Sequence, residues 1–292
     1  MNWSPGCFIF RPDPRLQDDE GQPGQDRAAT IMHMPHAHIF EPGLPVAADA
    51  RYVPDYAATL GDYLGVLDAH GMSHGVLVQP SFLGTDNSYL LEALARHPER
   101  LRGVIVVDDY KLERELSEER VRHLDAAGVR GVRLNLLGKP LPQISGASWQ
   151  LVGRIMQRHG WHLEIQASAQ QWVTLGPALV QWPALLVIDH LRLPDAAVPE
   201  GRAAVLQLAV RDSAWVKVSG CYRSTLEGAS SMVAELLAAG AGERIVFGSD
   251  WPFTRHEDND FGQLKAWDRE AVGADHFQQL FSDNASRLFA LS

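Results

Sequence analysis

The sequence has little cysteine, no long apolar run and no concentration of basic residues. Only two cysteines occur among 292 residues, Cys7 and Cys221, and a chain of this length can bury a core without disulfide bonds. We therefore expect a reducing compartment such as the cytoplasm. No apolar run approaches the ~20 residues that cross a bilayer, so we expect no membrane span. The 36 acidic and 26 basic residues give a net charge of −10 without a basic block, which argues against nucleic acid as a partner.

The first 31 residues lack the regular hydrophobic spacing of a helix or a strand. They are rich in proline, glycine, aspartate and glutamine, a composition typical of segments that form no packed core. A secretory signal would need a basic start and an apolar stretch of about 7 to 15 residues, and neither is present. We expect residues 1–31 to form a disordered leader and residues 32–292 to form one domain.

Beyond residue 31, short apolar runs rich in β-branched residues alternate with longer segments of helical period, as in repeated βα units with a parallel sheet. The predicted strands span residues 34–39, 75–79, 103–107, 131–136, 162–167, 184–189, 215–219 and 244–248. The predicted helices include residues 55–69, 88–96, 113–127, 149–158, 201–209, 232–239 and 276–289. This alternation of eight strands with helices predicts an α/β fold of the (β/α)8 TIM-barrel class. An open doubly wound sheet is the alternative, although no glycine-rich phosphate loop follows the first run.

Twelve histidines are the unusual feature of the composition. In such a barrel the active site lies at the carboxyl ends of the strands. His36 and His38 close the first run, and side chains two residues apart share a strand face. His190 follows the sixth run and Asp250 follows the eighth, which a closed barrel places beside the first. We therefore expect three imidazoles and one carboxylate to meet in one funnel.

Five sequence blocks in barrel order resemble the signature of the amidohydrolase superfamily, in its amidohydrolase-related branch. The blocks are His36-Ala-His38, Gly131-Val-Arg-Leu-Asn135, Val187-Ile-Asp-His190, Val216-Lys-Val-Ser219 and Phe247-Gly-Ser-Asp-Trp-Pro252. Within that branch the resemblance is greatest to the 2-pyrone-4,6-dicarboxylate lactonase-like hydrolases, and it runs from about Met34 to the C-terminus. It implies an enzyme of the metal-dependent hydrolase type that opens a small carboxylated lactone during the catabolism of aromatic compounds.

The resemblance also implies roles for individual side chains. It implies four catalytic residues: His36, His38, His190 and Asp250. It implies four substrate-binding residues: Ser81, Arg133, Lys139 and Arg223. Ester hydrolysis needs a base for water and hydrogen-bond donors for the carbonyl oxygen. We therefore expect Asp250 to act as the base, the imidazoles to polarise the carbonyl, and the cations to bind carboxylates.

The same resemblance leaves open whether the site binds a metal ion. Metal-binding branches of the superfamily add a histidine at the end of the fifth strand or a lysine or glutamate on the fourth. Here residues 166–168 read Gln-Ala-Ser and residues 134–135 read Leu-Asn, which argues against a binuclear centre. We expect either no metal or one divalent ion such as Zn²⁺, held by His36, His38 and Asp250.

Two other functions stay open at this point. A metal-dependent decarboxylase or another hydrolase of the superfamily uses similar first-strand histidines, and metal analysis would distinguish it. A non-catalytic barrel that binds anions is an alternative from a different class, which a panel of dicarboxylated lactones would test. We expect a small anionic substrate, neither nucleic acid nor a membrane as partner, and we leave open a homo-oligomer.

Overall fold

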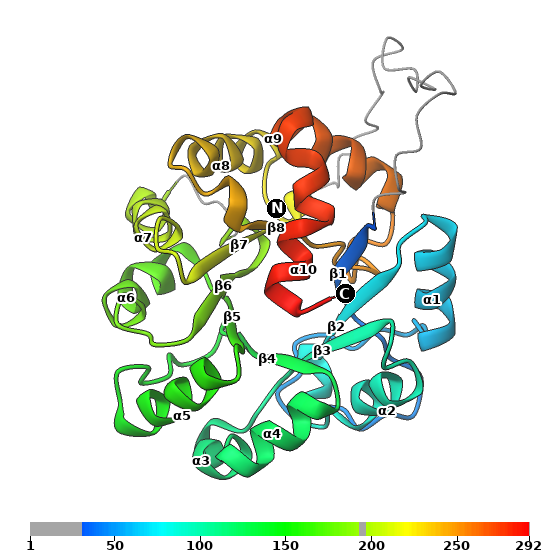
Figure 1. Ribbon diagram of the computed structural model, residues 1–292, viewed down its shortest axis with the longest axis vertical. Coiled ribbons are helices and arrows are strands. Elements are labelled where there is room, and N and C mark those ends of the chain that lie inside the picture. Colours follow the sequence, from blue (N-terminus) through cyan, green and yellow to red (C-terminus); the bar gives the residue numbers. More distant parts are fainter. Residues whose placement is uncertain (1–30, 193–196, 292) are drawn as a thin grey trace, which may run out of the picture. The chain divides into compact units, whose positions relative to one another are not determined.

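Eight parallel strands and the helices around them form the part of the chain that the computed structural model describes, residues 31–192 and 197–291 (Figure 1). The strands are β1 (His33–Ala37), β2 (His74–Val78), β3 (Leu101–Ile105), β4 (Val129–Asn135), β5 (His162–Gln166), β6 (Leu185–Ile188), β7 (Ala214–Val218) and β8 (Ile245–Phe247). The helices are α1 (Leu60–Ala69), α2 (Ser88–Arg96), α3 (Leu112–Glu115), α4 (Glu118–Ala126), α5 (Ala147–Arg158), α6 (Ala169–Leu179), α7 (Pro199–Ala209), α8 (Leu226–Ala238), α9 (Phe261–Phe281) and α10 (Asp283–Phe289). The expected leader, residues 1–31, lies outside the described residues apart from Ile31.

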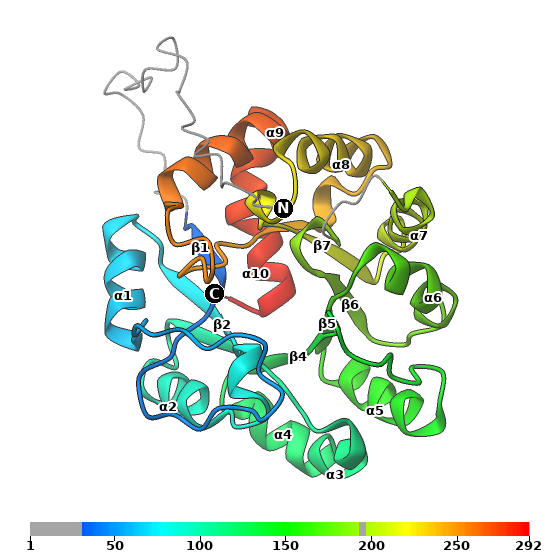
Figure 2. The same ribbon diagram turned by 180° about the vertical axis from the view of Figure 1, so that it is seen from behind.

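The strands follow one another in the sheet in chain order, β1 to β8, and every pair is parallel. Residues beyond β8 return to β1, because Ala37 forms a parallel bridge with Trp251. The view from behind shows the same ring of strands with helices outside it (Figure 2). The predicted TIM barrel is therefore confirmed. Within the described residues, no helix is long and apolar enough to cross a membrane.

Local sequence signals fix where several helices begin. Thr59 accepts the backbone N–H of Asp62 while the Asp62 side chain accepts the N–H of Thr59, so α1 starts five residues later than predicted. Ser168 and Gln171 make the same reciprocal pair at the start of α6. Such capping boxes satisfy backbone donors that the first helical turn leaves free.

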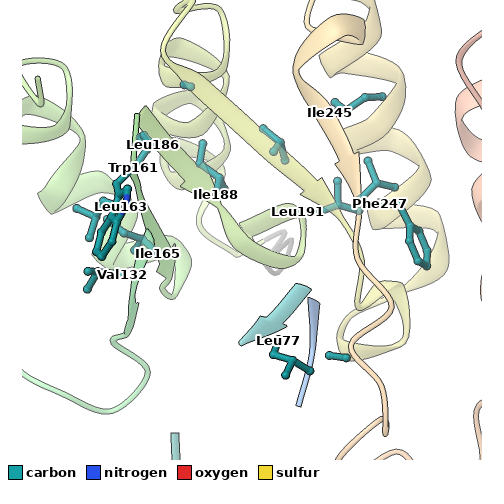
Figure 3. Close-up of a cluster of buried hydrophobic side chains, with 14 of the residues drawn as sticks. Leu77, Val132, Trp161, Leu163, Ile165, Leu186, Ile188, Leu191, Ile245 and Phe247 are labelled. Atoms are coloured by element: carbon teal, nitrogen blue, oxygen red, sulfur yellow. The ribbon is translucent and has the colours of Figure 1, made fainter. Parts of the chain in front are cut away.

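One large apolar cluster lies between the strands and the helices. On β5, Leu163 and Ile165 belong to this cluster, and on β6 Leu186 and Ile188 do so (Figure 3). The alternate residues of β5 face the inside of the barrel, as the period of two along a strand requires. These inward residues include His162 and Glu164, both fully buried, so the barrel interior combines apolar and charged side chains.

A second apolar cluster fills the inside of the barrel and closes one end. Val76, Val187 and Trp215 from three strands pack with Leu288 and Phe289 of α10. The ring of Phe289 also meets the ring of His162 edge-on, and the 5.5 Å between the ring centroids lies within the range of about 4.5–7 Å typical of aromatic pairs. Because His162 begins β5, α10 covers the amino ends of the strands. The carboxyl ends stay available for a site.

The packing of α6 against α7 gives a test of the fold. A Cβ built on Gly201 of α7 would lie 2.5 Å from the carbonyl oxygen of Ala169, which is backbone and has little room to move. We expect Gly201→Ala to lower the free energy of unfolding by about 1–3 kcal/mol, the usual cost of overpacking. Chemical denaturation of the purified protein measures this change.

Gly65 of α1 is the matched control, because a Cβ built there meets nothing within 4 Å. Gly65→Ala should raise the free energy of unfolding by about 0.5–1 kcal/mol, since alanine loses less backbone entropy in a helix. Equal effects of the two substitutions would contradict the close approach of α6 and α7.

Candidate active site

Three imidazoles and one carboxylate converge at the carboxyl ends of the strands. The Oδ1 atom of Asp250 lies 3.8 Å from His36 Nε2, 3.7 Å from His38 Nε2 and 3.9 Å from His190 Nε2. The two Nε2 atoms of His36 and His38 are 3.3 Å apart. All four side chains are buried. The funnel predicted from the sequence is thus present.

The backbone that presents these side chains is not regular strand. His36 has φ 61°, His190 φ 48° and Asp250 φ 57°, values in the left-handed region that cost bulky residues about 1–3 kcal/mol each. The pairing of β1 with β2 also shifts register between Met34 and Ala37. His36 and His38 therefore reach the same funnel through a bulge, rather than by the simple alternation assumed from sequence.

Hydrogen bonds across the closure of the barrel hold this conformation. The Asp250 N–H donates to the carbonyl of His36 at 2.7 Å, and the Ser249 hydroxyl donates to the same carbonyl at 2.8 Å. The catalytic candidates from the first and last strands are therefore fixed relative to each other by backbone contacts.

The two oxygens of Asp250 have different surroundings. Oδ2 accepts hydrogen bonds from the Tyr222 hydroxyl and from Arg223 Nε, both at 2.6 Å. Oδ1 has no hydrogen-bond partner among the described residues and faces the imidazoles. Burial favours the neutral acid, but the Arg223 guanidinium outweighs it and holds the pKa of Asp250 well below 3.8. Asp250 is thus an anchored carboxylate with one free oxygen.

A buried charge network lies beneath the histidines, and the sequence analysis missed it. Lys217 contacts the carboxylate of Glu164, and its Nζ lies 3.6 Å from Asp189 Oδ1. Arg133 donates to Asp189 Oδ2 through Nε at 3.0 Å and through Nη2 at 2.8 Å. Glu164, Asp189 and Lys217 are fully buried. The available signal was a charged residue inside each of three runs predicted as buried strands.

This network fixes the protonation of His36. The Lys217 ammonium has only donors, so its 2.9 Å contact with His36 Nδ1 makes that nitrogen the acceptor. Asp189 Oδ1 lies 3.1 Å from the same nitrogen but makes no hydrogen bond within the described residues. Burial, reinforced by Lys217, outweighs the attraction of Asp189 and lowers the pKa of His36 to about 3. The ring is then neutral and carries its proton on Nε2, directed into the site.

The other two imidazoles also contact groups outside the site through Nδ1. His38 Nδ1 donates to the carbonyl of Val78 at 2.7 Å, which leaves its Nε2 as an acceptor when the ring is neutral. His190 Nδ1 lies 3.0 Å from the Ser219 hydroxyl. When the Ser219 hydroxyl donates to Nδ1 of His190, the neutral ring carries its proton on Nε2. The site therefore offers two N–H donors, on His36 and His190, and one nitrogen acceptor, on His38, around Asp250.

A cavity of about 170 Å³ opens above this group. Its lining side chains are His38, Arg51, Tyr52, Pro80, Ser81, Phe82, Arg133, Asn135, Leu137, Gln166, His190, Arg223, Asp250, Thr254 and Arg255. Ser81, Arg133 and Arg223 thus lie where the sequence analysis expected them. A larger hollow of about 670 Å³ is lined by residues such as Asn87 and Lys111. None of the converging histidines lines it. We therefore place the site in the smaller cavity, where the titratable groups meet.

The structure does not bring Lys139 to this cavity. Its side chain is 40% exposed and pairs with Asp49 at 2.9 Å. Arg130, on the same strand β4 as Arg133, also pairs at the periphery, with Asp125 at 3.1 Å. Lys139 stays an untested prediction as a substrate contact, without geometric support.

The arrangement also offers ligands for a metal ion. His36, His38 and Asp250 supply atoms that all lie within 4.8 Å of one another, and a second such group is His36, Asp189 and His190. Imidazole nitrogen and carboxylate oxygen are ligands that zinc accepts. The donor types and spacings of the first group fit a single divalent ion.

Comparisons with known proteins agree with this picture. A family model described as amidohydrolase matches residues 33–291. A crystal structure from Pseudomonas putida, provisionally named 2-pyrone-4,6-dicarboxylic acid hydrolase, is 40% identical, covers 90% of this chain and 98% of that one, and has a TM-score of 0.80. The 2-pyrone-4,6-dicarboxylate hydrolase of Comamonas testosteroni is 28% identical over 87% of this chain and 88% of its own length. The 4-sulfomuconolactone hydrolase of Rhizobium radiobacter is 28% identical, with coverages of 88% and 89%.

The buried network predicts a large effect of Lys217 on stability. Lys217→Met leaves Glu164 and Asp189 buried with less positive charge, so we expect the free energy of unfolding to fall by about 3–5 kcal/mol. Chemical denaturation at neutral pH measures the change.

Lys139→Met is the control, since Lys139 also pairs with a carboxylate but at the surface. There we expect a change below about 1 kcal/mol. Similar losses for the two lysine variants would show that burial of Lys217 is not the source of its effect.

Proposed function

The chain belongs to the amidohydrolase family, and from that membership we propose that it is a hydrolase that opens a small carboxylated lactone. The observation that carries the proposal is Asp250, an ionised carboxylate with one oxygen held and the other free among three imidazoles. Both substrates named in its curated relatives, 2-pyrone-4,6-dicarboxylate and 4-sulfomuconolactone, are anionic lactones. A place in the catabolism of aromatic compounds fits such substrates.

The reaction begins with a water molecule beside Asp250 Oδ1. Asp250 removes a proton while the water oxygen attacks the lactone carbonyl carbon, and the carbonyl oxygen becomes an oxyanion. The Nε2–H groups of His36 and His190 are placed to donate to that oxygen, since both nitrogens lie within 4 Å of Asp250 Oδ1. Collapse of the tetrahedral intermediate breaks the ring C–O bond, and Asp250 returns its proton to the leaving oxygen.

The surroundings of Asp250 suit both proton transfers. Arg223 and Tyr222 hold Oδ2, so the free Oδ1 keeps a fixed direction toward the bound water. The same contacts stabilise the carboxylate, which keeps the base ionised before the attack. His38 Nε2, an acceptor, faces the Nε2–H of His36 at 3.3 Å and helps to keep that ring directed into the site.

A divalent ion would be held by His36, His38 and Asp250. When bound, it would lower the pKa of water and polarise the carbonyl. His36 would then need to move its proton from Nε2 to Nδ1, where Asp189 Oδ1 lies 3.1 Å away. The N–H donors described above supply polarisation from the chain itself, and we propose that they suffice.

Replacing the proposed base tests the mechanism. Asp250→Asn keeps the size of the side chain but removes its basicity, so we expect kcat on 2-pyrone-4,6-dicarboxylate to fall by about 10²- to 10⁴-fold. Loss of the pyrone absorbance follows turnover, and circular dichroism checks the fold. Near wild-type kcat in this variant would mean that another group is the base.

Asp268→Asn is the control for this substitution. Asp268 of α9 is also fully buried but does not line the cavity, and burial raises its pKa well above 3.8, so asparagine replaces a buried acid of the same shape away from the site. We expect kcat to stay at the wild-type value. A panel of carboxylated lactones run alongside separates catalysis from simple anion binding, because a binding protein opens none of them.

Removal of metal tests whether the chain's own donors suffice. We expect kcat to survive dialysis against a strong chelator, with metal content measured by mass spectrometry on the same sample. Loss of activity that is restored by Zn²⁺ would instead assign the polarising role to a bound ion.

A further inference from the structure

We propose that Arg51 and Arg255 form an anion-binding subsite at the mouth of the cavity, and that this subsite selects ligands with two carboxylates. The inference rests on the proposed function for the identity of the reaction and adds which lactones the site prefers. The subsite itself is a property of binding, and it can be tested without turnover.

The buried cations of the site are already paired within the protein. Arg133 contacts both Asp189, at 2.8 Å, and Glu164, at 3.2 Å. Lys217 contacts the same two carboxylates. Two buried positive charges therefore face two buried negative charges, and this layer has no excess charge for a ligand.

The same balance holds one layer higher. Arg223 Nε lies 2.6 Å from Asp250 Oδ2, so the guanidinium and the base form an ion pair. Arg133 and Arg223 line the cavity as predicted, but each is matched by a protein carboxylate. Their expected role as the main carboxylate-binding cations is therefore only partly supported by the geometry.

Arg51 and Arg255 differ from these residues. Both line the same cavity and are exposed. Within residues 31–192 and 197–291, neither guanidinium forms an ion pair within 4 Å. Asp49, near Arg51, is paired with Lys139 at 2.9 Å. Within the described residues, the lining thus has two positive charges that form no ion pair with a protein carboxylate, although the charge of Arg51 contributes to lowering the pKa of Asp49.

The two arginines are positioned by the loops that follow β1 and β8. A Cβ built on Gly138 would lie 3.8 Å from Arg51 Cδ, so Arg51 reaches across to the loop after β4. The Cζ atom of Arg255 lies 5.7 Å from the centre of the Tyr52 ring, within the range of a cation–π contact. The loop after β1 therefore carries Arg51 and contacts Arg255 through Tyr52.

A further contact ties these loops together. The Tyr56 hydroxyl donates to Glu257 Oε1 at 2.9 Å, and the backbone N–H of Arg255 donates to the same oxygen at 2.7 Å. Glu257 does not line the cavity, so its charge is directed to the loop rather than to a ligand. The mouth is thus held in place before a ligand binds, which reduces the entropic cost of binding.

Charge balance then sets the ligand class. A lactone ring is neutral, so its carboxylates are attracted most strongly to cations whose charge is not already balanced by a protein carboxylate. One carboxylate can bind one of the two arginines, whereas a dicarboxylate can engage both, and guanidinium groups bind carboxylates with two parallel hydrogen bonds. The subsite should therefore prefer dicarboxylated rings to monocarboxylated rings.

Binding of stable ring acids tests the subsite directly. We would measure pyridine-2,4-dicarboxylate and pyridine-2-carboxylate by isothermal titration calorimetry, since neither can be hydrolysed. Wild-type protein should bind the dicarboxylate about tenfold more tightly, and Arg51→Gln and Arg255→Gln should each weaken it about tenfold. The double variant should lose the preference. Arg154→Gln, which changes an exposed arginine of α5 outside the cavity, should bind as wild type does.

The possible outcomes separate the subsite from the reaction. Unchanged affinity in both single variants, or no binding of the dicarboxylate by the wild type, would overturn the subsite. Hydrolysis of lactones with an unaltered KM in the variants would overturn it too, while leaving the proposed function intact. If the wild-type protein opened no lactone but the double variant still lost the dicarboxylate preference, the subsite would be supported and the proposed function would be overturned.

Discussion

The contact of the Lys217 ammonium with Glu164, Asp189 and His36 is the interaction on which the site depends. It lies fully buried inside the barrel, and a buried charge is costly without a partner of opposite charge. By donating to His36 Nδ1 at 2.9 Å, Lys217 places the proton of that ring on Nε2. One buried ammonium thus neutralises the interior and sets the donor pattern of the layer above.

The remaining geometry follows from how the barrel closes. Backbone contacts between His36 and the segment after β8 bring Asp250 beside the imidazoles, at the cost of three residues in left-handed conformations. Tyr222 and Arg223 then hold one oxygen of Asp250. Strain at these positions is tolerated because the surrounding strands and hydrogen bonds determine them. The result is a rigid base with one free oxygen, above a charge-balanced interior and beneath a positively charged mouth.

Much of this architecture could be read from the sequence, because strand runs and strand ends are local features. All eight predicted strands occur, and the three histidines and Asp250 meet as expected. Helix limits were less exact. The predicted helix 113–127 divides into α3 and α4, since Ser117 caps a new helix by accepting the N–H of Arg120, and α6 was not among the helices predicted, although Ser168 and Gln171 mark its start.

The buried pairs could not be predicted in the same way. Whether Lys217 meets Glu164 depends on the register and curvature of strands far apart in sequence, and no local pattern encodes that. The same holds for Arg51, which reaches the cavity from an irregular loop while Lys139 does not. Pairing decides which cations are left for a ligand, and pairing is a property of the folded barrel.

The protonation of His36 tests the account most directly. Nitrogen-15 NMR of the protein labelled in histidine distinguishes the two neutral tautomers and the imidazolium, with His36→Gln used to assign the signal. The account predicts a neutral ring protonated on Nε2 at pH 7, because Lys217 donates to Nδ1. A ring protonated on Nδ1, or on both nitrogens, would contradict it.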